Sequence, residues 1–113
     1  MSLSFDNLEG VERRFLEIED ALASGELKPT EMTRYTKERS SLLDLVEAYR
    51  VYKNLRKSRD EAKEMLAEGD AELRVLAKEE VDRCERELAA QEKQLIILSL
   101  PKDPNDDRNV ILE

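Results

Sequence analysis

The chain has 113 residues, of which 41% are charged and only 4% aromatic, and its formal net charge is −8. This length suits one domain with a modest core, and the composition is typical of long exposed helices rather than of a β-sandwich or an α/β domain. The acidic excess disfavours binding to DNA, the lack of histidine excludes His-based catalysis and metal sites, and a single cysteine excludes an intramolecular disulfide.

The first predicted helix spans about residues 4–24. Ser4 is a suitable N-cap, and Gly25 is expected to end the helix. Gly10 inside it costs about 1 kcal/mol relative to alanine. Apolar residues recur at steps of three or four and form one stripe: Phe5, Leu8, Val11 (or, at that step, Glu12), Phe15, Ile18 and Leu22.

The second predicted helix spans about residues 31–67, with Thr30 as its expected N-cap. Neither glycine nor proline interrupts it, so it would be roughly 55 Å long. A small globule cannot enclose such an element, so it must lie alongside another helix. Its expected inner face is Met32, Tyr35, Leu42, Leu45, Val46, Tyr49, Tyr52, Leu55, Ala62 and Leu66.

The third predicted helix spans about residues 71–98, because Gly69 should end the second helix and Asp70 should cap the third. Its apolar residues alternate at steps of four and three: Ala77, Val81, Cys84, Leu88, Gln91, Leu95 and Leu98. This heptad seam predicts an antiparallel, left-handed coiled-coil hairpin with the second helix. We expect the first helix to pack across the base of that hairpin. The predicted fold is therefore all-α, an elongated three-helix unit.

A polar segment follows the helices and is predicted to be a domain junction. It contains Pro101, Lys102, Asp103, Pro104, Asp106, Arg108 and Asn109. The prolines stop the helix, and Asp and Asn favour turns. We therefore expect a helical domain at 1–100 and, at 101–113, an extended C-terminal stub that is a linker plus the truncated start of another domain. Its acidic spacing does not predict calcium binding, because Arg108 stands where a calcium loop needs glycine.

The stretch from Leu98 to Asn109 carries a family resemblance. Its pattern Leu-Pro-Lys-Asp-Pro-x-Asp-x-Arg-Asn, preceded by an apolar helix end and followed by an apolar strand, resembles the class I bacterial peptide chain release factors of the factor 1 type. The resemblance implies an N-terminal helical domain of a factor that terminates translation at stop codons in the cytoplasm. It also implies docking on the ribosome near the large-subunit stalk base and GTPase-associated centre, with ribosomal RNA and the GTPase release factor as partners.

In the resembled family, a later domain reads the codon and a Gly-Gly-Gln loop promotes hydrolysis, so we expect this chain to be no enzyme and to hold no catalytic residue, cofactor or metal. No apolar run approaches the roughly 20 residues of a membrane span, so no membrane partner is predicted. The alternative is a self-contained coiled-coil adaptor or chaperone-like module, which would share every helical prediction and differ only in the tail. Whether Met1, Ser2 and Leu3 derive from a vector stays open at this stage.

Three local features need separate interpretation. Arg50, Lys53 and Lys57 share one side of the second helix; we favour pairing with acids of the facing helix, and the alternative is contact with ribosomal RNA or an acidic protein. The acids considered are Glu80, Asp82 and Glu85.

Cys84 occupies an inward heptad position and is interpreted as a structural thiol. The apolar residues Leu95, Ile96, Ile97 and Leu98 exceed what one helix face needs, and we expect them to drive dimer formation if exposed.

Overall fold

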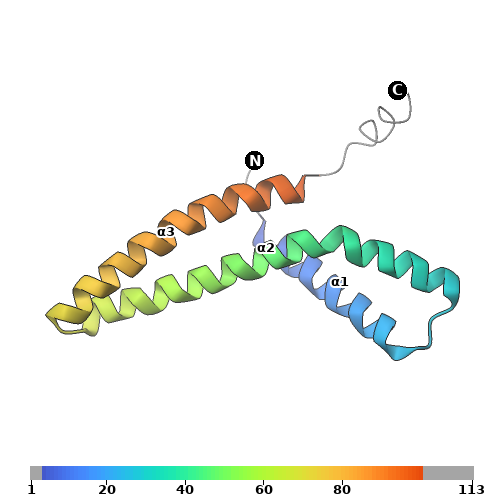
Figure 1. Ribbon diagram of the computed structural model, residues 1–113, viewed down its shortest axis with the longest axis horizontal. Coiled ribbons are helices and arrows are strands. Elements are labelled where there is room, and N and C mark those ends of the chain that lie inside the picture. Colours follow the sequence, from blue (N-terminus) through green and yellow to red (C-terminus); the bar gives the residue numbers. More distant parts are fainter. Residues whose placement is uncertain (1–3, 101–113) are drawn as a thin grey trace, which may run out of the picture.

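The structure, a computed structural model, describes residues 4–100. In that range the chain forms three helices: α1 (Phe5–Ser24), α2 (Pro29–Glu68) and α3 (Ala71–Ser99). They build two hairpins that share α2, because α1 runs back along its N-terminal half and α3 along its C-terminal half (Figure 1). The shape is elongated, with a radius of gyration of 19.5 Å, against roughly 13 Å for a compact globule of this size. The predicted all-α hairpin fold is confirmed.

The ends of the helices follow local sequence signals closely. The Ser4 hydroxyl accepts a hydrogen bond from the Asn7 N–H, and the Asp70 carboxylate accepts one from the Leu73 N–H. Gly25 ends α1 with a φ of 73°, in the left-handed region that favours glycine. These three predictions are confirmed.

The start of α2 differs from the expectation, because Thr30 lies inside the helix and Lys28 is the N-cap residue. The helix begins at Pro29, which is tolerated there because the first turn leaves backbone N–H groups without helical partners anyway. The Glu31 carboxylate accepts a hydrogen bond from the Lys28 N–H over 3.2 Å and stabilises this end.

The heptad seam of α3 faces α2 as predicted. Five of its seven positions are buried, and they are Ala77, Val81, Cys84, Leu88 and Leu95. The polar seam residue, Gln91, donates a hydrogen bond from its side-chain amide to the Ala48 carbonyl over 2.9 Å. Gln91 therefore joins α3 to the backbone of α2 instead of leaving an unpaired polar group in the seam. The left-handed supercoil stays a prediction.

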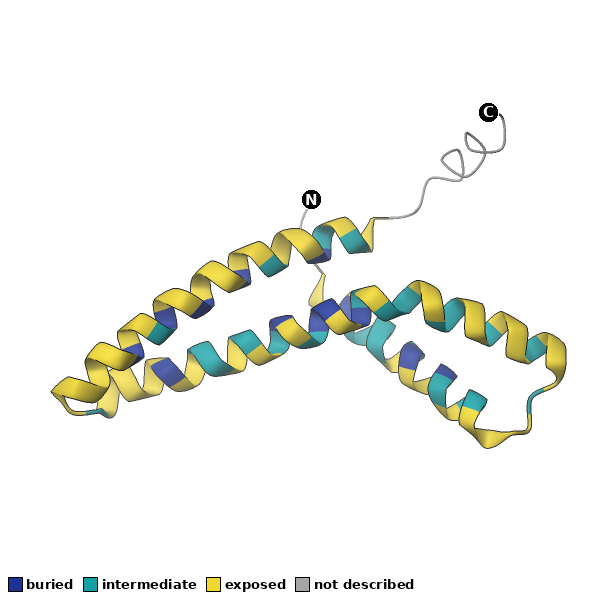
Figure 2. Cartoon of the chain, in the orientation of Figure 1, coloured by how far each residue is buried: buried dark blue, intermediate teal, exposed yellow. Residues whose placement is uncertain are grey.

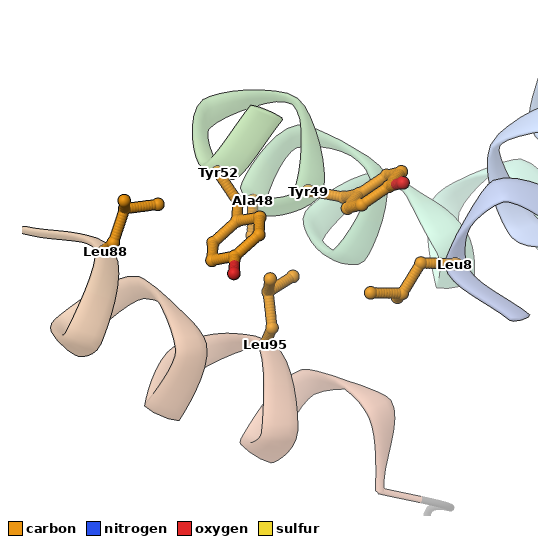
Figure 3. Packing of buried hydrophobic residues seen from close by; sticks show 6 residues of the cluster. All are labelled: Leu8, Ala48, Tyr49, Tyr52, Leu88 and Leu95. Carbon is orange, nitrogen blue, oxygen red and sulfur yellow. The ribbon is translucent and has the colours of Figure 1, made fainter. Parts of the chain in front are cut away.

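All three helices meet at one cluster of buried residues near the middle of α2, which we call the junction cluster (Figures 2 and 3). It consists of Leu8, Ala48, Tyr49, Tyr52, Leu88 and Leu95. Phe5 stacks on the Tyr52 ring with 5.5 Å between ring centroids. Only the first turns of α1 thus reach the base of the α2–α3 hairpin, and the rest of α1 extends away from α3 along α2. The expectation that α1 packs across the base holds only for this end.

Two glycines allow opposite tests of the local geometry. A Cβ at Gly69 would lie 2.7 Å from the Met65 carbonyl oxygen, whereas a Cβ at Gly10 would meet nothing within 4 Å. We expect Gly69→Ala to destabilise the chain by about 1 kcal/mol and Gly10→Ala to stabilise it by about 0.5–1 kcal/mol, because alanine favours the helix. Thermal unfolding followed by circular dichroism measures both. A Gly69→Ala variant as stable as the original chain would contradict the close approach at this turn.

Candidate functional site

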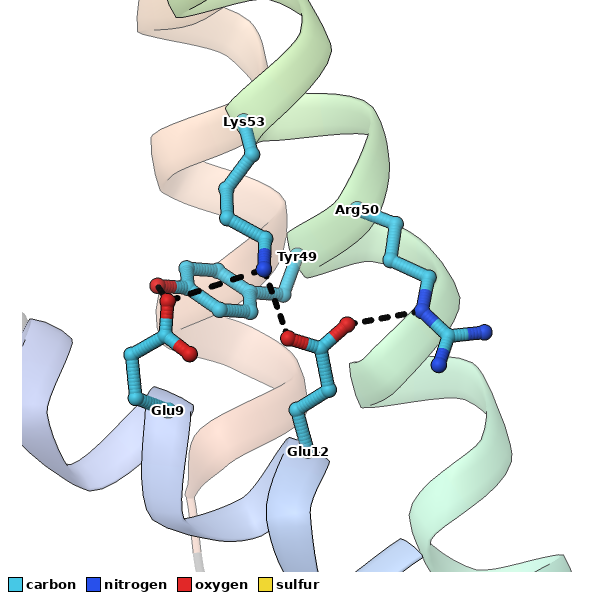
Figure 4. Close-up of polar contacts among 5 residues, drawn as sticks. All are labelled: Glu9, Glu12, Tyr49, Arg50 and Lys53. Carbon is cyan, nitrogen blue, oxygen red and sulfur yellow. Dashed lines mark hydrogen bonds and ion pairs between the residues drawn. The ribbon is translucent and has the colours of Figure 1, made fainter. Parts of the chain in front are cut away.

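The basic stretch of α2 is held by α1 rather than by α3. The Glu12 carboxylate accepts hydrogen bonds from Arg50 Nε over 2.7 Å and from Lys53 Nζ over 2.6 Å (Figure 4). Lys53 also lies 3.6 Å from Glu9, which accepts a hydrogen bond from the Tyr49 hydroxyl. The predicted pairing with Glu80, Asp82 or Glu85 is therefore wrong for Arg50 and Lys53. The helical period places these cations on one side of α2, but that side faces α1.

Glu12 is the most enclosed acid of this ion-pair network, with a side chain only 13% exposed. Partial burial acts to raise its pKa, but hydrogen bonds from Lys53 and Arg50 outweigh burial, and the pKa falls below its usual value. The hydrogen bond to Glu12 raises the pKa of Lys53 in turn. Burial, followed by the hydrogen bond to Glu9, raises the pKa of Tyr49 to about 12. At neutral pH Glu12 is therefore a carboxylate, Lys53 is an ammonium group and Tyr49 is an un-ionised phenol.

The other cations of α2 are placed differently. The Arg56 guanidinium lies over the rings of Phe5 and Tyr52, at 5.4 and 5.9 Å from their centroids. Lys57 is exposed and makes no ion pair within residues 4–100. Of Arg50, Lys53 and Lys57, only Lys57 thus makes no ion pair in the described part of the chain, and its ammonium group is free for a partner. The alternative interpretation, contact of these residues with ribosomal RNA or an acidic protein, stays untested.

Farther along the α1–α2 hairpin, two more ion pairs connect the helices. Arg14 Nε lies 2.8 Å from Glu38, and Arg39 lies 3.0 Å from Glu19. The hydrogen bond from Arg14 lowers the pKa of Glu38. Ion pairs therefore join α1 to α2 along most of the length of α1, which also contains the buried side chains of Phe15 and Ile18.

An open groove lies between α2 and α3 near the tip of their hairpin, and we call it the tip groove. It is lined by Ser58, Glu61, Ala62, Met65, Leu76, Ala77, Glu79, Glu80 and Arg83. Met65 and Leu76 are 44% and 60% exposed, although both are large and apolar. Sequence reasoning missed this groove. The available signal was Leu76, an apolar residue of α3 that does not belong to the heptad seam.

The apolar end of α3 is only partly available for self-association. Leu95 is fully buried in the junction cluster, whereas Ile97 is 62% exposed. The expected dimer surface is therefore wrong for Leu95, and dimer formation through its neighbours stays a prediction. No helix among residues 4–100 combines the length and apolar character needed to cross a membrane.

The chemical candidates are few. Cys84 is fully buried, and burial is the main reason why its thiol pKa is raised, which disfavours the reactive thiolate. Within residues 4–100, no group of three or more acidic or cysteine side chains is placed to hold a metal ion. The predicted domain junction, from Pro101 to Asn109, lies outside the described residues.

The chain is similar in sequence to known proteins over nearly its whole length. The model of the PCRF domain family matches residues 11–113. Curated relatives named peptide chain release factor 1 are 45% identical in Geobacillus sp. over 112 residues and 47% identical in Desulfatibacillum aliphaticivorans over 110 residues. Each alignment covers 96% of this chain but only 31% of the relative, so the chain spans about a third of the length of these proteins. No solved structure matches.

The Glu12 network makes a pH-dependent prediction. Glu12→Gln should destabilise the chain by about 1 kcal/mol at pH 7, because it weakens two charge-assisted hydrogen bonds that are partly screened by solvent. Since the pKa of Glu12 is lowered on folding, its contribution is present above its usual value of 4.5 and is lost as pH falls through the lowered value. The difference between variant and original chain should thus shrink towards about pH 3.

Urea unfolding across this pH range measures the effect. The matched control is Glu47→Gln, which changes an exposed carboxylate of α2 that makes no ion pair within residues 4–100. A difference between Glu12→Gln and the original chain that stayed constant with pH would show that the network contributes no charge-dependent stability.

Burial of Cys84 predicts slow alkylation. Under native conditions we expect a maleimide to modify this thiol at least about a hundredfold more slowly than free cysteine, because the α2–α3 seam must open first. Urea at unfolding concentration should abolish the difference. A native rate close to that of free cysteine, measured by mass spectrometry, would refute the buried position.

Proposed function

The chain belongs to the PCRF domain family, and from that premise we propose that it is the helical domain of a peptide chain release factor that acts in translation termination at stop codons. One observation carries the proposal: the family match extends across residues 11–113, nearly the whole chain. The relatives named peptide chain release factor 1, at 40–47% identity, agree with it. The elongated helical unit provides surface for docking. Within residues 4–100 it contains no cluster of side chains that could hold a metal ion.

We further propose that the domain docks on the ribosome near the stalk base of the large subunit and communicates there with the GTPase release factor, in the cytoplasm. What supports this is the sequence resemblance around the junction and the shape of the molecule. A unit 60 Å long with surfaces at both ends can contact two partners that a compact domain of this size could not reach together.

The chemistry of peptide release is proposed to lie outside these 113 residues. A Gly-Gly-Gln sequence does not occur in the chain, and the chain spans about a third of the length of its relatives. Its role would then be to position a release factor rather than to hydrolyse the ester. A self-contained coiled-coil adaptor is the other candidate, and the family match favours the release factor over it.

A competition experiment tests the proposal. Excess chain, added to a termination reaction driven by the intact Geobacillus relative, should slow peptide release, because both would occupy the same ribosomal surface. The chain alone should release no peptide from the same ribosomes. Ribosomes from which the stalk-base protein has been removed serve as the control, and on them the chain should neither bind nor compete.

Two outcomes would contradict the proposal. Release by the chain alone would place catalytic chemistry in these residues. Unchanged release by the intact factor at saturating chain, together with no cosedimentation of the chain with large subunits, would remove the docking role and favour the adaptor.

A further inference from the structure

The tip groove lies over two small buried residues, one from α2 and one from α3. Ala62 and Ala77 are both buried, at 4% and 3% exposure, and form the floor. Met65 and Leu76 stand at the walls with much of their surface in water. Exposed apolar side chains next to a concave floor are a typical feature of protein-binding surfaces. In Figure 2 the outermost turns of this hairpin are mostly exposed, and buried segments begin a little farther along both helices.

The rim of the groove is acidic and largely uncompensated. Glu80 pairs with Arg83 over 2.6 Å, and Arg83 also pairs with Glu87. Within residues 4–100, neither Glu61 nor Glu79 makes an ion pair. From Asp60 to Glu80 the chain carries eight acidic and three basic residues, so this third of α2 and α3 holds most of the net negative charge. A partner that fits must bring cations together with apolar side chains.

We propose that the tip groove binds a cationic amphipathic helix of a partner protein. A third helix can lie alongside two antiparallel helices at the usual distance of about 8–10 Å. Its apolar residues, one turn apart, would then fit over Ala62 and Ala77 between Met65 and Leu76, and its flanking lysines or arginines would reach Glu61 and Glu79. RNA is disfavoured because its phosphates would face the acidic rim. A second copy of this chain is disfavoured because its net charge of −8 would be repelled.

This inference is independent of the proposed function, because it rests on the chemistry of the groove alone. The partner could be any protein that carries such a cationic amphipathic helix. The inference also differs from the predicted contact through Lys57, which would need an anionic partner on the middle of α2.

Fluorescence anisotropy with the whole 113-residue chain tests the proposal. The probe is a labelled model helix of about 20 residues, with leucines on one face and lysines on the other. The comparison probes are the same helix with glutamate in place of lysine and a single-stranded RNA oligonucleotide. We expect saturable binding of the lysine helix only, weakened by added salt.

The decisive pair of variants is Leu76→Glu and Val51→Glu. Both residues are exposed and apolar, at 60% and 48%, but Val51 does not line the groove. Each change adds one negative charge, which would strengthen a non-specific attraction to the lysine helix. Groove binding predicts instead that Leu76→Glu weakens binding by at least about tenfold while Val51→Glu does not. Equal affinities of the two variants would overturn the proposal.

A second pair tests the acidic rim and replaces the first if Leu76→Glu loses its helical circular dichroism. Glu61→Gln with Glu79→Gln removes two groove carboxylates, and Asp82→Asn with Glu85→Gln removes two exposed carboxylates of α3 outside the groove. We expect the first pair to weaken binding at least about threefold more than the second. Equal weakening would indicate general charge attraction and refute the groove, as would binding of the RNA or self-association of the chain in place of helix binding.

Discussion

The relative placement of the two hairpins depends on how Tyr49 and Tyr52 are buried. Their rings pack in the same junction cluster, yet their hydroxyl groups bond to different helices: Tyr49 donates to Glu9 of α1 over 2.8 Å, and Tyr52 donates to Glu92 of α3 over 2.9 Å. Because α2 is too long for either neighbour to cover alone, its apolar stripe must pass from one helix to the other. These two tyrosines lie where that change occurs, so they fix both α1 and α3 against α2.

The distribution of charge follows from this arrangement. Acids of α1 approach the middle of α2 and pair with Arg50 and Lys53, so two cations of the most basic stretch of the chain are compensated by α1. In the described residues, no third helix lies beside the C-terminal end of α2 and the N-terminal end of α3. Glu61 and Glu79 remain unpaired there. A chain with an overall acidic charge thereby concentrates it at one tip, beside exposed apolar side chains, rather than spreading it evenly.

Local signals in the sequence were sufficient for the helices and their ends. Ser4, Gly25 and Asp70 act within one turn of their own position, so their roles can be inferred without knowledge of the tertiary fold. The heptad seam of α3 was equally predictable, because a period of three and four residues identifies one face. Thr30 was misassigned because Pro29 is acceptable in the first turn of a helix, which moved the start of α2 to an earlier residue.

The sequence by itself determined three helices, their lengths, the seam between α2 and α3, and the kinship of the chain with the release factors, because each of these depends on short-range spacing or on an unusual string of residues. Tertiary structure alone decided which acids neutralise Arg50 and Lys53, why Leu95 is unavailable to a partner, and where an apolar groove stays open between Met65 and Leu76. A helical period identifies which side of a helix is apolar or charged, but not which neighbour faces that side. That choice depends on the point along α2 at which its contact with α1 ends and its contact with α3 begins.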